Sequence, residues 1–252
     1  MKVYGKTDTG KVRNNNQDSF RIVTVDKYTV GIVCDGMGGA AGGSTASNTA
    51  CDTFIDYIKE QIETGVTPEE FEGLLRKGAE KANENVYTAS RNDKELEGMG
   101  TTLCAFITDS ENVWAISIGD SRLYMFSHGK VYQLSHDHSY VQVLIDSGAI
   151  TKEESRNHPN KNIITRAVGT QKEVECDTFV MPFDMDGLLL CSDGLTNYVT
   201  DDELSELFCQ YSNEIETLAD TYIEKANDGG GGDNITVLVA IGDTNSANNS
   251  ER

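Results

Sequence analysis

Three aspartates lie where apolar stretches of the sequence begin or end, and a glycine accompanies each of them. Asp35 and Asp193 each follow an apolar run, whereas Asp233 precedes one. Runs of this kind predict buried strands, so each carboxylate is expected at a strand end. Carboxylates gathered in one pocket repel one another strongly unless a cation neutralises them. The three aspartates therefore predict one shared cation site.

The residue types favour a hard divalent cation. Carboxylate oxygens suit Mg²⁺ or Mn²⁺, whereas the scarcity of His and the position of several Cys inside apolar runs argue against zinc. Gly36 lets the backbone approach closely and could offer its carbonyl oxygen. Asp120 is a fourth aspartate at a predicted strand end. Two ions about 3.5 to 4 Å apart, bridged by a carboxylate, would activate a water and hold the group being transferred.

An arginine near the beginning of the chain supplies the opposite charge. Arg13 lies in the polar segment 10–18, and a guanidinium can bind phosphate through two hydrogen bonds. Metal ions together with arginine indicate a phosphate ester as the substrate. Taken alone, Arg13 is more often a solvated loop residue, and a single Asp-Gly pair is most often a turn.

Other catalytic motifs are absent or ambiguous. The glycine-rich segment 36–43 is not followed by the Gly-Lys-Ser/Thr of a Walker loop. Ser192 lacks the Gly-x-Ser-x-Gly elbow that serine hydrolases use. His136 and His138, with Asp137 between them, could bind metal or transfer protons, but a polar entry to a helix is the preferred explanation.

The composition limits the classes of partner. Acidic residues outnumber basic ones by 41 to 21, and the formal net charge of −20 argues against binding nucleic acid or an anionic membrane. The six Cys form no C-x-x-C pair, which favours a reducing compartment. Neither an apolar leader nor a long uncharged apolar stretch is found, so a cytoplasmic protein is expected.

The hydrophobic pattern predicts the elements that must position these residues. Strands are expected at residues 2–7, 19–25, 28–34, 101–108, 112–118, 122–127, 130–134, 173–181, 188–191 and 235–241. Helices are expected at residues 44–65 with Ser44 as N-cap, 67–91, 138–147, 201–209 and 213–227. Because the helices come in pairs between groups of strands, the pattern favours an α+β fold of antiparallel sheets with helices packed outside.

No linker, repeat or low-complexity segment divides the chain, so a single domain is predicted over residues 1–243. The remaining residues 244–252 are polar and are expected to be a disordered tail. The polar segment 151–162 shows little periodicity and is expected to be an exposed loop or flap.

An ordered series of short motifs extends along nearly the whole chain. The motifs are VRNNNQD (12–18), CDGMGG (34–39), GMGTT (98–102), IGDSR (118–122), LSHDHS (134–139), TRAVG (165–169), LCSDGL (190–195) and DNIT (233–236). In this order they resemble the metal-dependent serine/threonine protein phosphatases of type 2C, the PPM family, particularly its bacterial members. The resemblance implies a four-layer αββα sandwich of two antiparallel sheets flanked by helix pairs, with metals in a cleft at one edge.

The resemblance also implies a metal-binding role for individual residues. Asp35 would bridge two Mn²⁺ or Mg²⁺ ions, and the carbonyl of Gly36 would bind the second ion. Asp193 and Asp233 would complete the ligands of the first ion. Asp18 would hold a metal-bound water.

The implied chemistry is hydrolysis of phosphoserine or phosphothreonine by in-line attack of a metal-bound water or hydroxide, without a phosphoenzyme. Arg13 would bind the substrate phosphate, and Asp120 would form a third, weaker metal site with Asp193. Two positions depart from the animal branch of the family. Gln17 stands where many members have Glu, and Met37 stands where animal enzymes have a His general acid, so a metal-bound water is the expected acid.

Phosphorylated proteins are the implied substrates, and a bacterial serine/threonine kinase is the implied opposing enzyme. The chain is expected to be a monomer that binds neither nucleic acid nor membrane. Two alternatives stay open: a phosphatase-fold regulator that binds phosphoproteins without catalysis, and a phosphohydrolase acting on small phosphate esters or nucleotides. A shallow cleft would favour protein substrates, whereas a deep closed pocket would favour metabolites.

Overall fold

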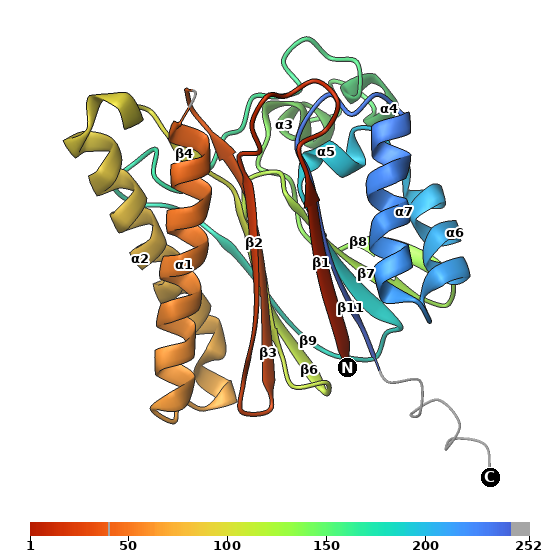
Figure 1. Ribbon diagram of the computed structural model, residues 1–252, viewed down its shortest axis with the longest axis horizontal. Helices are drawn as coiled ribbons and strands as arrows, with labels where there is room; N and C mark the ends of the chain where they lie inside the picture. Colours follow the sequence, from red (N-terminus) through yellow and green to blue (C-terminus); the bar gives the residue numbers. More distant parts are fainter. Residues whose placement is uncertain (40, 243–252) are drawn as a thin grey trace.

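The computed structural model describes residues 1–39 and 41–242, which form two antiparallel β-sheets packed against each other (Figure 1). The first sheet has the order β1-β11-β10-β7-β8, with strands Lys2–Asp8, Ile235–Ile241, Gly187–Cys191, Arg122–Ser127 and Lys130–Gln133. The second has the order β2-β3-β5-β6-β9, with strands Asp18–Val25, Tyr28–Met37, Leu103–Thr108, Asn112–Ile118 and Asp177–Pro182. The short strand β4 (Gly100–Thr101) pairs with the end of β3.

Apolar side chains from both sheets fill the space between them. Val33, Phe106 and Leu238 are fully buried members of this layer. Ile32, the neighbour of Val33 on β3, packs instead on the opposite face beneath the helices, as the pleat of a strand requires. Gly31 leaves room for the Phe106 ring of the neighbouring strand, because a Cβ there would lie 2.9 Å from that ring and 3.2 Å from Leu238 of the opposite sheet. Burial on both faces explains why β3 is a continuous apolar run.

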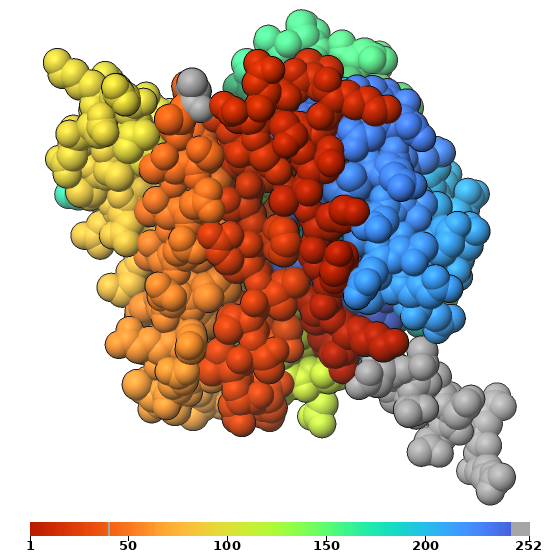
Figure 2. All heavy atoms as spheres, viewed as in Figure 1, coloured from red at the N-terminus to blue at the C-terminus, as the bar shows by residue number. Residues whose placement is uncertain are grey.

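Helices cover both outer faces of the sandwich. Helices α1 (Gly42–Glu63) and α2 (Phe71–Asn92) pack on the second sheet, and α6 (Asp201–Tyr211) and α7 (Ile215–Asp228) pack on the first (Figure 1). Short 3-10 helices, η1 (Pro68–Glu70) and η2 (Lys94–Leu96), flank α2. In Figure 2 the first two strands (red) lie between α1 (orange) and the C-terminal helices (blue). This arrangement confirms the α+β fold with a four-layer αββα sandwich.

The start of α1 differs from the prediction. The helix begins at Gly42, two residues before Ser44, and Ala41 precedes it without a side-chain cap. The Ser44 hydroxyl instead donates to the Ala41 carbonyl at 3.3 Å. A Cβ at Gly42 would lie 3.1 Å from the Cβ of Met99, so packing of the helix start on Met99 sets its position. The prediction of Ser44 as N-cap is therefore wrong.

Three short elements were not predicted correctly. The predicted loop at 151–162 contains helix α4 (Lys152–Ser155). A capping box between Thr151 and Glu154 stabilises the start of this helix. Helix α5 (Asp193–Thr196) was not expected, and the strand predicted from residue 173 begins only at Asp177, as β9. Helices of about one turn, such as α4 and α5, carry too few residues for hydrophobic periodicity to show.

The remaining predictions concern the segment 138–147, the C-terminal residues and membrane-spanning helices. Helix α3 (Tyr140–Asp146) lies within the predicted segment 138–147, and Ser139 caps it by accepting from the Gln142 N–H. The predicted tail at 244–252 and the domain boundary at 243 lie outside the described residues. Within the part of the chain that the structure describes, no helix has both the length and the apolar character needed to cross a bilayer.

A largely buried ion pair stabilises the first sheet and permits a test. The Asp137 carboxylate accepts from Arg122 Nε at 3.0 Å and from Nη2 at 2.7 Å, and also from Gln133 at 2.7 Å. Asp137→Ala would leave the Arg122 charge without its partner, so the free energy of unfolding is expected to fall by about 3 kcal/mol in urea denaturation.

A matched control for this test is the exposed pair between Arg21 and Asp52, which are 2.9 Å apart. Because solvent screens an exposed pair, Asp52→Ala is expected to cost less than about 1 kcal/mol. Equal losses in the two variants would contradict the assignment of Asp137 as a structural partner of Arg122.

Candidate metal centre

Two of the predicted aspartates face each other across β2 and β3. Asp18, the first residue of β2, is the cross-strand partner of Asp35 near the end of β3. The Asp35 N–H donates to the Thr102 hydroxyl at 2.8 Å, and its carbonyl accepts from the Thr102 N–H at 2.9 Å. Directly opposed residues of an antiparallel pair project from the same face. The strand register therefore brings these two carboxylates together.

Asp18 also connects the two sheets. Its Oδ2 accepts from the Ser192 hydroxyl, at the end of β10, and from the Thr236 hydroxyl in β11, each at 2.7 Å. Its Oδ1 is buried and has no hydrogen-bond partner. Burial raises the pKa of Asp18 to about 6, although both hydroxyl bonds act in the opposite direction. Asp18 is thus held rigidly by one oxygen and keeps the other available.

Asp193 and Asp120 contribute two further oxygens of the same kind. Asp193 begins α5, and its Oδ2 accepts from Asn197 Nδ2 at 3.0 Å. Asp193 Oδ1 and Asp120 Oδ1 are both buried without a hydrogen-bond partner. A buried acceptor left unpaired costs about 1–3 kcal/mol, and a charged one costs more. Three orphaned oxygens within one group of carboxylates indicate that the site is built for a cation.

Arg13 and Asp233 form the solvent-facing edge of the site. Arg13 Nη2 donates to Asp233 Oδ2 at 2.8 Å, and Asp233 Oδ1 accepts from the Asn234 N–H at 2.9 Å. The hydrogen bond and charge of Asp233 raise the pKa of the Arg13 guanidinium, and the charges of Asp35 and Asp193 add to the effect. The cation predicted to bind phosphate therefore lies beside the predicted metal ligands.

We call Asp18, Asp35, Asp120, Asp193 and Asp233 the acidic cluster. Burial raises the pKa of Asp35 well above its ordinary 3.8, and the other four carboxylates raise it further. Burial and then Asp233 raise the pKa of Asp193, and burial and then Asp193 raise that of Asp120. These shifts favour the binding of protons or of a cation by the cluster.

The donor set suits Mg²⁺ or Mn²⁺, ions that do not need a fully enclosed protein cage. Carboxylate oxygens are the ligands that these ions prefer. Within residues 1–39 and 41–242, no three or more His, Cys, Asp or Glu side chains are arranged so that they could hold an ion by themselves. Mg²⁺ keeps several waters and uses one or two carboxylates, so an open arrangement of mutually repelling carboxylates suits it.

The backbone at Gly36 is tightly enclosed. A Cβ at this position would lie 2.0 Å from the Gly43 carbonyl oxygen and 2.5 Å from that of Gln17, so only glycine fits. The Gly36 N–H donates to the Gln17 carbonyl at 3.1 Å. These contacts explain the glycine beside Asp35. That its carbonyl binds the second ion stays a prediction.

The sequence did not single out several residues that support the site, although they lie inside the motifs at 98–102, 190–195 and 233–236. They are Thr102, Ser192, Asn234 and Thr236. Asn234 holds the loop that carries Arg13, because its Oδ1 accepts from the Gln17 N–H at 2.8 Å and its Nδ2 donates to the carbonyls of Thr9 and Asn15. The signal available in the sequence was a hydroxyl or amide side chain next to a predicted metal ligand. The hydrogen-bond partner of that side chain could not be predicted, because the partner is distant in the chain.

The flap contacts the cluster through one polar chain. Lys161 donates to Asn197 Oδ1 at 3.4 Å, and Asn197 in turn donates to Asp193. The two histidines of the motif at 134–139 have separate environments. His136 is exposed and contacts Asp146, whereas His138 is buried and contacts Gly119. The contacts of the two imidazole rings therefore place neither His136 nor His138 in the acidic cluster.

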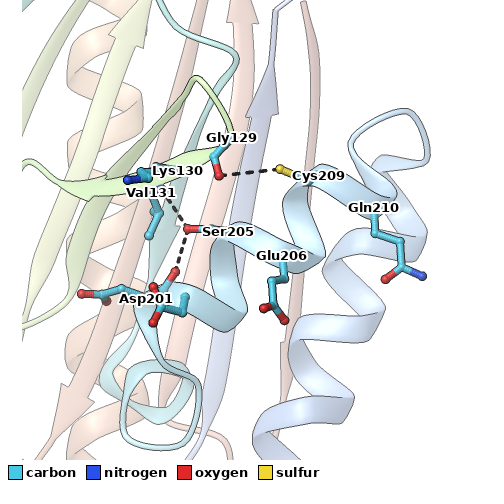
Figure 3. Close-up of a pocket in the computed structure, with 9 residues that line it drawn as sticks. Gly129, Lys130, Val131, Asp201, Ser205, Glu206, Cys209 and Gln210 are labelled. Carbon is cyan, nitrogen blue, oxygen red and sulfur yellow. Dashed lines mark hydrogen bonds between the residues drawn. The ribbon is translucent and has the colours of Figure 1, made fainter.

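A groove of about 720 Å³ lies away from the acidic cluster, between α6 and the turn that joins β7 to β8 (Figure 3). Gly129, Lys130 and Val131 form one wall, and the α6 residues from Asp201 onward form the other. A second groove, of about 320 Å³, lies beside Arg76 and Asp177. No member of the acidic cluster lines either groove. The two grooves therefore lie apart from the predicted metal site.

The fold and the site define a class of protein: a two-sheet sandwich, covered by helices on both sides, with buried carboxylates at the ends of its strands. The family model described as protein phosphatase 2C matches residues 10–225. The chain belongs to the protein phosphatase 2C family, which confirms the predicted family and the predicted enzyme class, a protein phosphatase.

Individual relatives agree with this assignment. The serine/threonine phosphatase stp of Listeria monocytogenes is 42% identical over 236 residues, which cover 93% of each chain. The crystal structure of the serine/threonine phosphatase Stp1 from Staphylococcus aureus has a TM-score of 0.87 and 34% identity, covering 95% of this chain and 94% of that one. The catalytic domain of the phosphatase PstP, in complex with two manganese ions, has a TM-score of 0.83 and 32% identity, covering 95% and 97%.

Proposed function

We propose that this protein removes phosphate from phosphoserine and phosphothreonine in other proteins, using Mn²⁺ or Mg²⁺ held by the acidic cluster. The observation that carries the proposal is the set of three unpartnered buried oxygens, on Asp18, Asp120 and Asp193, in a cluster whose member Asp233 binds the guanidinium of Arg13. The names of the relatives support the substrate class, and the manganese-bound neighbour supports the metal.

Each residue of the site has a proposed role. Asp35 would be shared by two ions, with Asp193 and Asp233 on the first and the Gly36 carbonyl on the second. When bound, such ions lower the pKa of water and neutralise phosphate charge, which allows direct in-line hydrolysis without a phosphoenzyme. Asp18 would act through water, because its Oδ2 is already occupied by Ser192 and Thr236. Asp120 and Asp193 would share a third ion.

Arg13 and Met37 define what the side chains contribute on the substrate side. Arg13 would exchange its partner Asp233 for the substrate phosphate, which a planar guanidinium binds through two donors. Met37, the last residue of β3, has no proton to donate to the leaving serine or threonine oxygen. That proton would then come from water at the site.

We propose protein substrates rather than metabolites. No member of the acidic cluster lines either of the two grooves described above, and Arg13 is half-exposed. An open site of this kind accommodates a phosphorylated loop, whereas a metabolite would need an enclosing pocket.

We further propose that the protein acts in the cytoplasm as a monomer and that it opposes a serine/threonine kinase. All six Cys are free thiols, which supports a reducing compartment.

The test is phosphate release from a phosphothreonine peptide in the presence of Mn²⁺. Activity is expected to disappear with chelator and to fall about a hundredfold in Asp193→Ala, which removes a proposed ligand of the first ion. A nucleotide library added as competitor should leave the peptide reaction unchanged. Full activity in the Asp193 variant would overturn the metal assignment, and strong nucleotide competition would favour a small-molecule phosphohydrolase.

A further inference from the structure

We infer that His138 is a positioning residue that fixes the backbone of Gly119, and thereby the direction in which Asp120 presents its carboxylate to a cation. The inference rests on the proposed function, because it concerns the ion that Asp120 is proposed to share with Asp193. In the sequence, His138 was compatible with a metal ligand, an acid/base group or a polar helix entry. The structure places its ring in contact with the residue before Asp120.

His138 holds both polar groups of the Gly119 backbone. The His138 N–H donates to the Gly119 carbonyl at 2.9 Å, and the Gly119 N–H donates to Nδ1 of the His138 ring at 3.0 Å. The His138 side chain is only 4% exposed, so water does not compete for these bonds. The His138 carbonyl accepts from the Thr165 N–H at 2.8 Å, which anchors the histidine itself.

The bond from Gly119 requires one tautomer of the imidazole. Because Nδ1 accepts, the hydrogen of the neutral ring is on Nε2, which donates to Asp177 Oδ2 at 3.1 Å. Arg166 Nη1 donates to the other Asp177 oxygen at 3.1 Å and lies 3.0 Å from Nε2. Asp177 therefore selects the tautomer that can accept from Gly119. Without Asp177, Arg166 is placed to donate to Nε2, which favours the opposite tautomer.

The other side of Gly119 is fixed by Thr102. Gly119 has a φ of +103°, and a Cβ there would lie 2.6 Å from the Thr102 methyl carbon. The Thr102 hydroxyl accepts from the Asp35 N–H at 2.8 Å and contacts the Ser121 hydroxyl at 2.7 Å. Gly119 thus lies between His138 and Thr102, the residue that supports Asp35, and only glycine fits there.

Asp120 depends on this backbone for its orientation. Its Oδ1 has no hydrogen-bond partner, so no side chain holds that oxygen in place. Residues that orient a metal ligand typically change metal affinity or activity by about 10- to 100-fold when they are replaced. An effect of that size on the ion that needs Asp120 is therefore expected from His138.

Two variants of His138 separate its two ring contacts. His138→Asn keeps an oxygen near the position of Nδ1, so it can still accept from Gly119. His138→Gln reaches the position of Nε2, so it keeps the contact with Asp177 but loses the acceptor for Gly119. Mn²⁺ titrations followed by electron paramagnetic resonance would be compared with wild type, using Asp120→Ala to identify the ion that needs Asp120.

His138→Gln is expected to weaken that ion by about ten- to a hundredfold, whereas His138→Asn stays close to wild type. Equal affinities in wild type and His138→Gln would overturn the inference, as would a titration unchanged by Asp120→Ala. Parallel losses in both His138 variants that follow their loss of thermal stability would also overturn it, because they would indicate a structural role alone.

Asp177→Ala provides an independent variant in case His138→Gln does not fold. In metal-free protein, imidazole nitrogen NMR shifts should show the hydrogen on Nε2 in wild type and on Nδ1 in Asp177→Ala, with the same ion weakened. An unchanged tautomer together with unchanged Mn²⁺ binding would overturn the inference. Phosphopeptide hydrolysis is measured separately, so an inactive wild type with this Mn²⁺ pattern would reject the proposed function and leave the inference standing.

Discussion

Replacing Asp35 with asparagine is expected to lower kcat/KM for a phosphothreonine peptide about a thousandfold at saturating Mn²⁺, which equals roughly 4 kcal/mol. The other four members of the acidic cluster all raise the pKa of Asp35. Asp35 is also the proposed ligand of both ions. Asparagine keeps the shape of the side chain but removes the charge that would balance two cations. Phosphate release at several Mn²⁺ concentrations measures the effect.

The same substitution is expected to stabilise the metal-free protein. Burial and the neighbouring carboxylates raise the pKa of Asp35, so the folded protein holds this proton more tightly than the unfolded chain does. The resulting stabilisation is complete below the ordinary pKa of 3.8 and is lost as the pH rises toward the folded-state pKa. Asparagine cannot ionise and avoids this loss. In EDTA at pH 7.5, Tm should rise, by about 2–4 °C per kcal/mol for a chain of this size.

Asp109→Asn is the matched control for Asp35→Asn. Asp109 is also shielded, with its side chain 6% exposed, but it lies outside the acidic cluster. Burial acts to raise its pKa, yet the N–H groups of Asn112 and Glu111 and the charge of Lys27 lower it overall. Its replacement should therefore leave activity unchanged and lower Tm. An active Asp35→Asn enzyme, or a Tm change of the same sign in both variants, would contradict the proposed role of Asp35.

Mn²⁺ is expected to raise the Tm of the wild-type protein strongly at pH 7.5 and weakly at pH 5. At one hundred times the Kd, a ligand that binds only the folded state adds about 2.7 kcal/mol, or about 5–10 °C here. The pKa of Asp18 is raised from 3.8 to about 6, mainly by burial, so below pH 6 protons compete with the cation.

The sign of this pH dependence follows from the raised pKa. In the metal-free protein, the stability that protonated Asp18 contributes is lost as the pH rises from about 4 through 6. Mn²⁺ replaces the proton and reverses that loss, so the difference in Tm with and without Mn²⁺ should grow across this range. Thermal scans at pH 5, 6 and 7.5 with EDTA or Mn²⁺ measure it. A difference independent of pH, or one retained in Asp35→Asn, would reject the acidic cluster as the binding site.

The candidate ligands could be predicted because their signals are local. A strand that is buried on both faces appears as a continuous apolar run, and a charged residue at its end must be explained by something outside the core. Asp35 and Asp193 both carry this signal. The structure confirms that their strands are buried, and it brings both residues into one electrostatic environment with Asp233 and Arg13.

Short elements and helix starts were less predictable. Helix α4 has four residues, and its capping box between Thr151 and Glu154 was the only local signal for it. The start of α1 depends on Met99, which is more than 50 residues away in the sequence from Gly42. Contacts between distant residues override a local capping preference, so Ser44 was chosen wrongly.

The sequence by itself determined which residue types are available for chemistry: aspartates at strand ends, an arginine for phosphate and glycines where the backbone must pass closely. Only the tertiary structure decided which oxygens of Asp18, Asp120 and Asp193 stay unpartnered, and that the His138 ring accepts from the Gly119 N–H. The physical reason is that hydrogen-bond partners and burial depend on strands that are distant in the chain. Those strands meet only when the two sheets pack together.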